Sequence, residues 1–307
     1  MVFPGCRHQT VKHFNAALNT PAGPHPWILI PVHNRRELTL ACLHHLASIG
    51  ALRTFTTLVI DDGSKDETAS SIAREFPGVR ILAGDGHLWW TGAIARGMAE
   101  ADRCGATAVI WLNDDCLPAA GTLETLITLS ARNPAAIVGA TCSTGAEPTE
   151  ASKPVTTAFI SRRTYAVPAA GQTELAVDGL SGFCVAVPRQ VWTSVGFPDA
   201  TRFPHYYGDT SYTLLARKNG FAVILAGSAH ARLTHYLERA ATVTSYVRRQ
   251  PTDRRQWRDV FMSPRSPFRA ASQWHYLQLR YGKFAGAVLA TVRLARWCVE
   301  FIAAAKG

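Results

Sequence analysis

Short apolar runs alternate with helical runs over the first half of this chain, and no other feature constrains its fold as strongly. The apolar runs lie at Trp27–Val32, Leu58–Ile60, Val79–Leu82 and Ala108–Leu112. Uninterrupted runs of this length are typical of parallel strands buried on both faces. Segments with helical spacing lie at 37–49, 65–76, 92–104 and 121–132. This alternation predicts an α/β fold with right-handed crossovers.

The pattern changes after residue 136 to shorter strands and turns. Candidate strands lie at 137–140, 156–161, 183–187 and 222–225. We therefore expect a Rossmann-like half over residues 27–135, of the type that binds nucleotides, and a second half over 136–242 that completes a mixed sheet. Residues 1–26 show no periodicity and end in a Pro- and Gly-rich stretch, which predicts a loosely held extension. Residues 243–307 form a basic helical segment.

One helix start can be predicted in detail. Ser64 and Glu67 have the spacing of a capping box, in which a Ser side chain and a Glu three residues later satisfy the first backbone N–H groups of a helix. This pattern predicts that the second helix begins at residue 65 with Ser64 as its N-cap.

Three acidic clusters follow the predicted strands. They are Asp61-Asp62-Gly63-Ser64, Asn113-Asp114-Asp115 and Gly208-Asp209. Ligands of open α/β sheets bind outside the carboxyl ends of the strands, so we expect the clusters to share one crevice. A carboxylate there can accept hydrogen bonds from ribose hydroxyls or a base N–H. An adjacent acidic pair can supply oxygen ligands to a divalent cation that bridges to phosphate.

Each cluster taken alone also has a plainer interpretation. Asp-Asp-Gly-Ser is a favourable turn sequence, and two adjacent acids suit a solvated loop. Asp209 precedes a helix predicted at 211–218, where an aspartate often serves as N-cap. These alternatives stay open at the level of single motifs.

The excess positive charge lies in the last quarter of the chain. The net charge is +10; residues 1–231 contain 18 basic and 18 acidic side chains, whereas residues 232–307 contain 14 and 4. Clustered Lys and Arg attract any anionic partner, so phospholipid, a polyanionic acceptor and nucleic acid are all compatible with this tail.

A helical segment is predicted from residue 268 to 305. Its apolar part has an uncharged run of only nine residues, Phe284 to Val292, which is too short to span a bilayer. Basic and apolar side chains lie together along it: Arg280, Lys283, Val288, Arg293, Arg296, Trp297 and Phe301. This composition is typical of a helix at an anionic membrane surface. An ordinary amphipathic helix packed on the domain is equally compatible.

Cysteine usage and the first residues bear on location. The seven cysteines are an odd number, widely spaced and without a Cys-x-x-Cys pair, which predicts buried, reduced thiols. The first residues do not have the order of charged, apolar and small residues of a signal peptide. We expect a cytoplasmic protein, and the basic tail leaves open a peripheral position on the inner face of the membrane.

Taken together, the motifs are far more specific. They are Pro31-Val-His-Asn-Arg35, the Asp-Asp-Gly-Ser turn, Asn113-Asp114-Asp115, Ser181-Gly182-Phe183, Val195-Gly196-Phe197 and Asp209. In this order the chain resembles, over residues 27–235, the inverting family 2 glycosyltransferases of the GT-A fold. Its segment Gly84–Gly92 is similar to one in bacterial rhamnosyltransferase-like members that build surface polysaccharide.

The resemblance implies a role for each cluster. The donor nucleotide site would be lined by Pro31, His33, Asp61, Asp62, Asp85 and Asp114, with Asp62 in contact with the base. Asp115 would bind Mg²⁺ or Mn²⁺ directly, and Asp209 would be the catalytic base. Some relatives have a histidine near the position of His235 that reaches the metal or the diphosphate, although a surface or core histidine is an alternative. Arg96, on the helix predicted at 92–104, could face the diphosphate.

The acceptor side is predicted to contain Trp89, Trp90, Gly182 and Phe183. The flat faces of the two tryptophans suit a sugar ring, but a buried tryptophan pair is an equally good account. The chain also departs from the family pattern at three positions. Gly208 stands where an acidic residue commonly precedes the base, Ser211 replaces a frequent Asp, and His87 replaces a common Asn.

The implied activity is metal-dependent transfer of a hexosyl group, rhamnosyl included, with inversion. The donor would be a UDP-, dTDP- or GDP-sugar, and the acceptor a saccharide or a lipid-linked saccharide in cell-surface polysaccharide assembly, with one sugar added per encounter. A nucleotidyltransferase is an alternative, but it usually needs a Gly-rich loop near the first strand, and residues 31–36 contain no glycine. A non-catalytic carbohydrate- or nucleic-acid-binding protein is the other alternative. We expect no nucleic acid partner.

Overall fold

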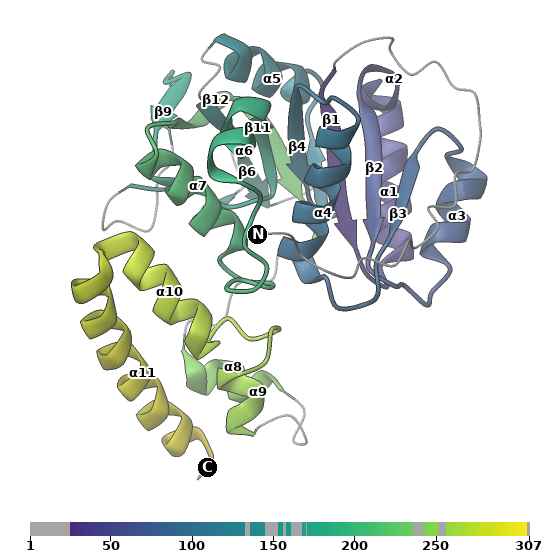
Figure 1. Cartoon of the computed structure of the whole chain (residues 1–307). Helices are drawn as coiled ribbons and strands as arrows, with labels where there is room; N and C mark the ends of the chain where they lie inside the picture. Colours follow the sequence, from purple (N-terminus) through teal and green to yellow (C-terminus); the bar gives the residue numbers. More distant parts are fainter. Residues whose placement is uncertain are drawn as a thin grey trace.

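The computed structural model describes residues 25–132, 136–144, 153–155, 158–160, 168–169, 171–235, 242–250 and 256–305. A twisted sheet with helices on both faces forms the main body, and four helices at the end of the chain lie beside it (Figure 1). Over the described residues the main sheet has ten strands. Its order is β3-β2-β1-β4-β11-β6-β12-β5, with β7 paired to β6 and β9 paired to β12. The extension predicted for residues 1–26 lies, up to residue 24, outside the described residues.

The first half of the sheet is parallel, as the apolar runs predict. Its strands are β1 (Trp27–Val32), β2 (Thr56–Asp61), β3 (Arg80–Ala83) and β4 (Ala108–Leu112). The central strand β1 pairs with β2 on one side and with β4 on the other. This register places Val32 opposite Asp61 and Leu29 opposite Trp111, so β1, β2 and β4 end at the same edge of the sheet.

Alternate residues of these strands supply two separate hydrophobic layers. Ile28 and Ile30 belong to one layer, and Leu29 and Ile60 belong to the other. The first layer is covered by α1 (Arg36–Ser48), α2 (Ala51–Thr54), α3 (Thr68–Glu75) and α5 (Thr122–Arg132). The second is covered by α4 (Trp89–Arg103), α6 (Arg189–Val195) and α7 (Gly208–Lys218). Burial on both faces explains why β1 and β4 are continuously apolar.

The second half makes the sheet mixed, as predicted. Its strands are β5 (Cys116–Pro118), β6 (Ala136–Thr144), β7 (Lys153–Val155), β9 (Glu174–Ala176), β11 (Cys184–Pro188) and β12 (Ala222–Leu233). A separate pair contains β8 (Ala158–Phe159) and β10 (Gly179–Leu180). β11 runs antiparallel between β4 and β6 and joins the two halves. The strand predicted at 156–161 is represented by β8, and residues 156, 157 and 161 lie outside the described residues.

The predicted capping box at Ser64 is wrong. α3 begins at Thr68, and Glu67 is its N-cap residue in a left-handed conformation without a side-chain cap. Tertiary contacts hold the preceding residues in a loop, because Ser64 Oγ accepts from the Asn34 N–H at 2.8 Å. Asp66 in the same loop accepts from the Arg36 N–H at 2.9 Å. The Ser64 hydroxyl is therefore bonded to the loop after β1 and does not cap the helix.

The basic C-terminal segment is helical, but the single stretch predicted from 268 to 305 is two helices. Its elements are α8 (Val243–Arg249), α9 (Trp257–Phe261), α10 (Ala270–Tyr281) and α11 (Lys283–Ala305). Gly282, with φ of +87°, ends α10 and lets the chain fold back. None of the described helices is long and apolar enough to cross a membrane.

The structure also corrects which face of α11 looks outward. Trp297 was predicted beside the basic residues of a membrane-facing side, but it is buried, with its ring 4.8 Å from that of Phe268. Phe301 stacks edge-on against Phe261 at 5.7 Å and packs on the same cluster. Both aromatic residues therefore hold the helical segment together.

The close approach of α10 and α11 depends on Gly286. A Cβ added there would lie 2.4 Å from Gln278 Cα and 2.4 Å from the Leu277 carbonyl oxygen, which are backbone atoms that cannot turn aside. We expect Gly286→Val to separate the two helices and to lower stability by about 1–3 kcal/mol, the usual cost of overpacking. Thermal unfolding measures this, with Ala285→Val at the exposed neighbouring position as control. Equal melting temperatures for the two variants would contradict the close contact.

Candidate active site

The ends of β1, β2 and β4 bring the first two acidic clusters to one edge of the sheet. The Asp62 N–H donates to the Val32 carbonyl at 2.9 Å, which continues the β1–β2 ladder one step past the strands. On the other side, the Asn113 N–H donates to the Phe183 carbonyl at 3.0 Å and ties the end of β4 to the start of β11. The sequence prediction that these clusters share one edge is therefore met by the backbone itself.

Asp62 uses both carboxylate oxygens inside the chain. It is buried, and its Oδ1 accepts from the Gly86 N–H at 2.8 Å while its Oδ2 accepts from the Trp89 N–H at 3.0 Å. Gly84 is required beside it, since a Cβ there would lie 2.6 Å from Asp62 Oδ1. Asp62 thus anchors the loop of residues 84–89 across the end of β2. The contact to a nucleotide base that the sequence suggests for Asp62 stays a prediction.

The other residues of the predicted donor site surround Asp62. A His33 ring nitrogen lies 2.6 Å from the Asp62 carbonyl oxygen, and Asp61 Oδ1 accepts from the Ser64 N–H at 2.9 Å. Pro31 stands opposite Ile60 near the end of β1. Asp85 is exposed and accepts from the His87 N–H at 2.9 Å. Arg96 is half-buried in α4, and within the described residues it makes no hydrogen bond or ion pair with the acidic clusters.

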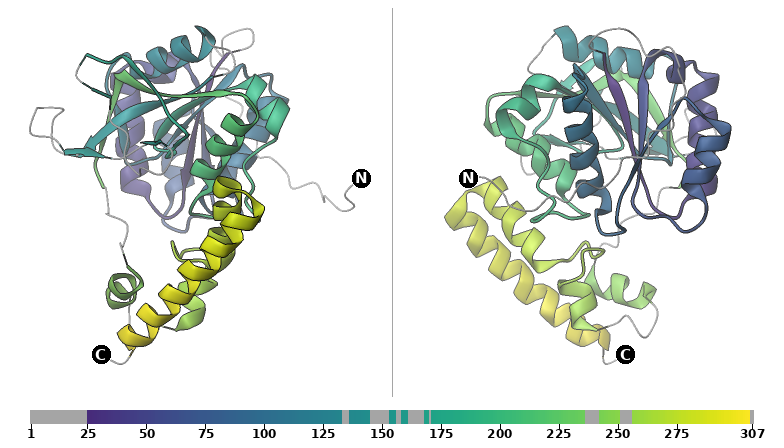
Figure 2. Two further views of the ribbon diagram at one scale, coloured as in Figure 1. Left: turned by 90° about the vertical axis from the view of Figure 1, so that its left-hand side faces the viewer. Right: turned by 45° about the vertical axis from the view of Figure 1, so that its right-hand side comes forward.

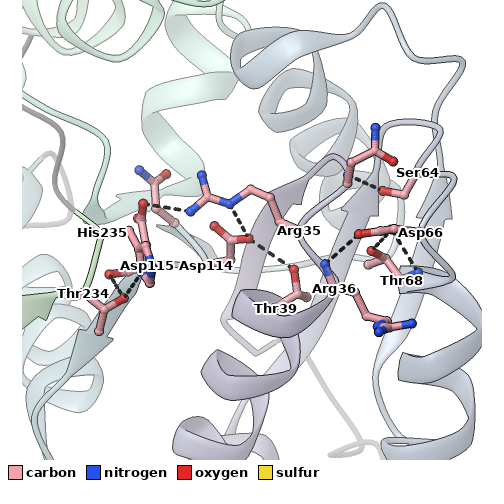
Figure 3. Close-up of polar contacts among 12 residues, drawn as sticks. Arg35, Arg36, Thr39, Ser64, Asp66, Thr68, Asp114, Asp115, Thr234 and His235 are labelled. Carbon is pink, nitrogen blue, oxygen red and sulfur yellow. Dashed lines mark hydrogen bonds and ion pairs between the residues drawn. The ribbon is translucent and has the colours of Figure 1, made fainter.

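The acidic pair after β4 is held by one arginine (Figure 3). Arg35 Nε lies 3.1 Å from Asp114 Oδ2, and Arg35 Nη2 lies 2.9 Å from Asp115 Oδ2. Thr39 Oγ1 donates to Asp114 Oδ2 at 3.2 Å from the first turn of α1. Burial raises the pKa of Asp114 to about 6; Arg35 acts against this rise, whereas the neighbouring Asp115 adds to it. Arg35 therefore supplies the positive charge that two adjacent acids need.

The two carboxylate oxygens of Asp115 differ in their contacts. Its Oδ1 is buried and has no hydrogen-bond partner among the described residues. A buried carboxylate oxygen normally has a partner, so an orphaned one suggests a ligand position. Among the described residues, no group of three or more His, Cys, Asp or Glu side chains is arranged to hold a metal ion by itself. A cation at this position would have to complete its coordination from other ligands.

His235 lies next to Asp115, as Figure 3 shows. The Thr234 N–H donates to the Asp115 carbonyl at 2.9 Å, and this bond brings the end of β12 to the acidic pair. His235 itself is exposed, and a ring nitrogen lies 3.3 Å from Thr234 Oγ1. The chain thus places an imidazole beside Asp115 although the two are far apart in sequence.

A second group of predicted residues meets around Trp90. Trp90 Nε1 donates to Asn113 Oδ1 at 2.9 Å, and its ring packs edge-on against Trp111 at 5.7 Å. Gly182 lies directly against it, since a Cβ at this position would be 2.4 Å from Trp90 Cζ2 and 3.1 Å from Asp209 Cβ. Trp90 is therefore a structural support that orders Asn113 beside the acidic pair. Phe183, the neighbour of Gly182, is partly buried and packs against the core.

Asp209 is in the first turn of α7 and is not its N-cap. Its Oδ2 accepts from the Gly182 N–H at 2.8 Å, and its Oδ1 accepts from the Thr210 N–H at 2.6 Å. The cap position belongs to Tyr207, in a left-handed conformation. Two N–H donors hold this carboxylate at the amino-terminal end of α7. Asp209 is thus a carboxylate oriented toward the glycine that separates it from Trp90.

Trp89 has a different environment from Trp90. Its φ of +55° is unusual for a bulky residue and is held by the bond from its N–H to Asp62. Its ring lies 6.0 Å from that of His205, and the Arg265 guanidinium carbon is 5.1 Å from its centroid. Trp89 is partly exposed, so its ring can border a binding site.

Sequence reasoning did not assign Arg35, Thr39, His205 or Arg265 to the site. Arg35 stood within the quoted Pro31–Arg35 motif, and an arginine just beyond a strand end next to an acidic crevice was a usable signal. His205 and Arg265 carry no such signal, because they reach Trp89 only through the folding of a loop and of the C-terminal segment.

The comparison with protein families decides the identity of the chain. The model of Glycosyl transferase family 2 matches residues 27–191, more than half of the 307 residues. This chain belongs to that family. The match includes the Asp61–Ser64 turn, Asn113–Asp115 and Gly182, and ends before Asp209 and His235. No curated protein matches the chain in sequence.

Solved glycosyltransferase structures share the fold. GalNAc-T7 with UDP, GalNAc and Mn²⁺ has a TM-score of 0.57 at 14% identity, over 83% of this chain and 50% of its own. The mannosyltransferase PcManGT from Pyrobaculum calidifontis, in complex with GDP-Man and Mn²⁺, gives 0.53 at 16%, over 89% and 75%. S. aureus TarS 1–349 in complex with UDP-GlcNAc gives 0.52 at 11%, over 74% and 64%. This family 2 chain therefore has the predicted GT-A fold, and it spans half the length of GalNAc-T7.

The loop of residues 84–89 gives a direct test of the role of Asp62. An amide at this position offers one acceptor oxygen, so in Asp62→Asn either the Gly86 or the Trp89 N–H loses its partner. We expect a loss of about 1–3 kcal/mol in stability, the usual cost of an unsatisfied buried group. Amide hydrogen exchange at Gly86 and Trp89 should also become faster. Asp85→Asn, which changes the same loop at an exposed position, is the control; equal exchange in both variants would contradict the anchoring role.

Proposed function

We propose that this glycosyltransferase moves a single sugar from a nucleotide-sugar donor to a saccharide or lipid-linked acceptor with inversion of the anomeric centre. The observation that carries the proposal is the convergence of two carboxylate sites. The Asp114–Asp115 pair lies at the end of β4, and the Asp209 carboxylate lies on the other side of Trp90 and Gly182. Donor and acceptor would bind on either side of this boundary.

The donor side is assigned to the edge formed by β1 and β2. Pro31, His33, Asp61 and Asp85 would line the nucleotide, with Asp62 close by. Uridine, thymidine and guanosine diphosphate sugars are the candidates, and the similar structures were determined with UDP, GDP-Man and UDP-GlcNAc. Arg96 on α4 and Arg35 are the nearby cations that could approach a diphosphate.

The residues present fit a divalent cation at Asp115. Its orphaned Oδ1 is a free carboxylate ligand, His235 is adjacent, and Asp114 supports the position. Mn²⁺ or Mg²⁺ bound there would neutralise the charge that develops on the departing diphosphate. The donor's phosphate oxygens would supply the ligands that the protein does not. Arg35 pairs with both carboxylates.

This assignment predicts metal-dependent nucleotide binding. We expect one of UDP, GDP, dTDP and CDP to raise the melting temperature in Mn²⁺ but not in EDTA, because a ligand of the native state alone stabilises it. Asp115→Asn should abolish the shift, whereas Glu124→Gln, an exposed acid on α5, should keep it. Equal shifts in Mn²⁺ and EDTA would contradict the metal role of Asp115. No shift with any nucleotide, together with salt-dependent DNA binding, would favour a binding-only protein.

Asp209 is assigned as the base. The acceptor hydroxyl oxygen would form a bond to the anomeric carbon as the bond from that carbon to the diphosphate oxygen breaks, and Asp209 would take the hydroxyl proton. The bonds from Gly182 and Thr210 hold the carboxylate in one orientation at the amino-terminal end of α7. Phe183 and the partly exposed ring of Trp89 would border the acceptor. A single displacement inverts the anomeric configuration.

Replacing the base separates transfer from donor binding. We expect Asp209→Asn to lower kcat by about 100- to 10,000-fold, the range of a lost general base, while the nucleotide-dependent rise in melting temperature stays unchanged. Transfer is measured as the nucleoside diphosphate that is released in the presence of acceptor. Asp199→Asn, an acidic side chain shortly before the same helix, serves as control. Turnover of the Asp209 variant near that of the control would show that another group is the base.

The proposal also includes the transferred sugar and the pathway. The Gly84–Gly92 segment supports a rhamnosyl or other hexosyl group and a role in cell-surface polysaccharide assembly. A location at the cytoplasmic face of a membrane, peripheral to the bilayer, agrees with the basic C-terminal segment.

A further inference from the structure

α11 exposes a continuous apolar stripe. Phe284 is 85% exposed, Val292 64% and Val299 67%. The other large apolar residues on this outer face are Val288, Leu289 and Ile302. Phe284, Val288 and Val292 recur at intervals of four, and Val299 and Ile302 continue the same side. From Phe284 to Ile302 the stripe is about 27 Å long at 1.5 Å per residue.

This stripe is not needed for the packing of α11. The opposite face is also apolar and is covered: Gly286 lies against α10, Ala290 is fully buried, and Trp297 packs on Phe268. In Figures 1 and 2, α11 lies along the outer side of the helical segment, with α10 between it and the sheet. One apolar face of α11 is therefore packed on the protein, and the second apolar face is exposed and available to a partner.

The charges around the stripe favour one kind of partner. Lys283 at the start of α11 and Arg296 in its second half are exposed, and Arg296 also pairs with Glu300 at 3.3 Å. The segment from residue 232 carries 14 basic and 4 acidic side chains. A second copy of the chain would bring the same excess of positive charge against this one and be repelled. An anionic surface with an apolar layer beneath it satisfies both the cations and the stripe.

We infer that the outer face of α11 docks on an anionic phospholipid bilayer, with the helix axis in the plane of the membrane. Phe284, Val288 and Val292 enter the boundary between headgroups and acyl chains. Lys283 and Arg296 contact the lipid phosphates. This inference rests on α11 alone and does not depend on the proposed sugar transfer.

Docking would also place the active site beside the lipid surface. α10 connects α11 to the main body through α7, and Arg265, which precedes α10, lies over Trp89. The helical segment lies on the side toward which β1 and β2 point (Figure 1). Arg265 and α7 therefore link the helical segment to the side of the site that carries Trp89 and Asp209.

Vesicle flotation with the full chain tests the inference. We expect the protein to float with vesicles of 70% phosphatidylcholine and 30% phosphatidylglycerol, and to bind pure phosphatidylcholine at least tenfold more weakly. Val288→Glu and Val292→Glu should each lower binding to the anionic vesicles at least tenfold. Met262→Glu is the matched control, since Met262 is an equally exposed apolar residue of the same segment outside α11. Unchanged circular dichroism and melting temperature would verify folding.

Two results of these experiments would overturn the inference, and a fluorescence measurement supplies a third. One is vesicle binding that the α11 variants leave unchanged. The other is a wild-type dimer in analytical ultracentrifugation that dissociates in Val292→Glu while no variant binds lipid, which would assign the stripe to a second copy. A Phe284→Trp variant, which keeps the face apolar, gives an independent readout. Its added fluorescence should be quenched by brominated lipid in anionic vesicles, and absence of quenching also counts against docking. Nucleotide-dependent stabilisation, measured without lipid, separates this outcome from failure of the proposed function.

Discussion

The position of β1 between β2 and β4 is the constraint on which the structure depends. Because β1 pairs in parallel register with both neighbours, the residues that follow all three strands must lie at one edge. Both faces of these strands are covered by helices, so a shift of one residue would exchange the two buried layers and is strongly disfavoured. The register therefore brings Asp62 and Asp114 to the same edge of the sheet before any side chain contributes.

Burying carboxylates at that edge costs free energy, and the fold offsets this cost in two different ways. Asp62 receives two backbone N–H groups from the loop that it anchors. Asp114 and Asp115 share the guanidinium of Arg35, and burial still raises the pKa of Asp114. The first arrangement is complete within the chain, whereas the second leaves one Asp115 oxygen without a partner. This difference separates a carboxylate that supports structure from one that is available to a ligand.

The C-terminal segment relates to the site through a few specific contacts. Arg265 reaches the ring of Trp89, and α10 packs on α7, which carries Asp209 in its first turn. A helix pair that depends on Gly286 for its close approach thus packs on the helix that carries Asp209. Because α11 is apolar on its inner and outer faces, the segment can pack on the protein and still present a hydrophobic surface. The packing that the sequence left open for this helix is seen in the structure, and its contact with a membrane surface stays a proposal.

The sequence by itself determined the α/β class, the parallel first half of the sheet and the edge at which the first two acidic clusters meet, because buried parallel strands are apolar along most of their length. It also indicated the family through its motifs. Only the tertiary structure decided that α3 starts at Thr68, that a glycine breaks the last helical stretch, and that Trp297 points inward. It alone paired Arg35 with the acidic residues and Trp90 with Gly182. These contacts join residues far apart in the chain, and hydrogen-bond geometry and packing, which no local pattern encodes, select them.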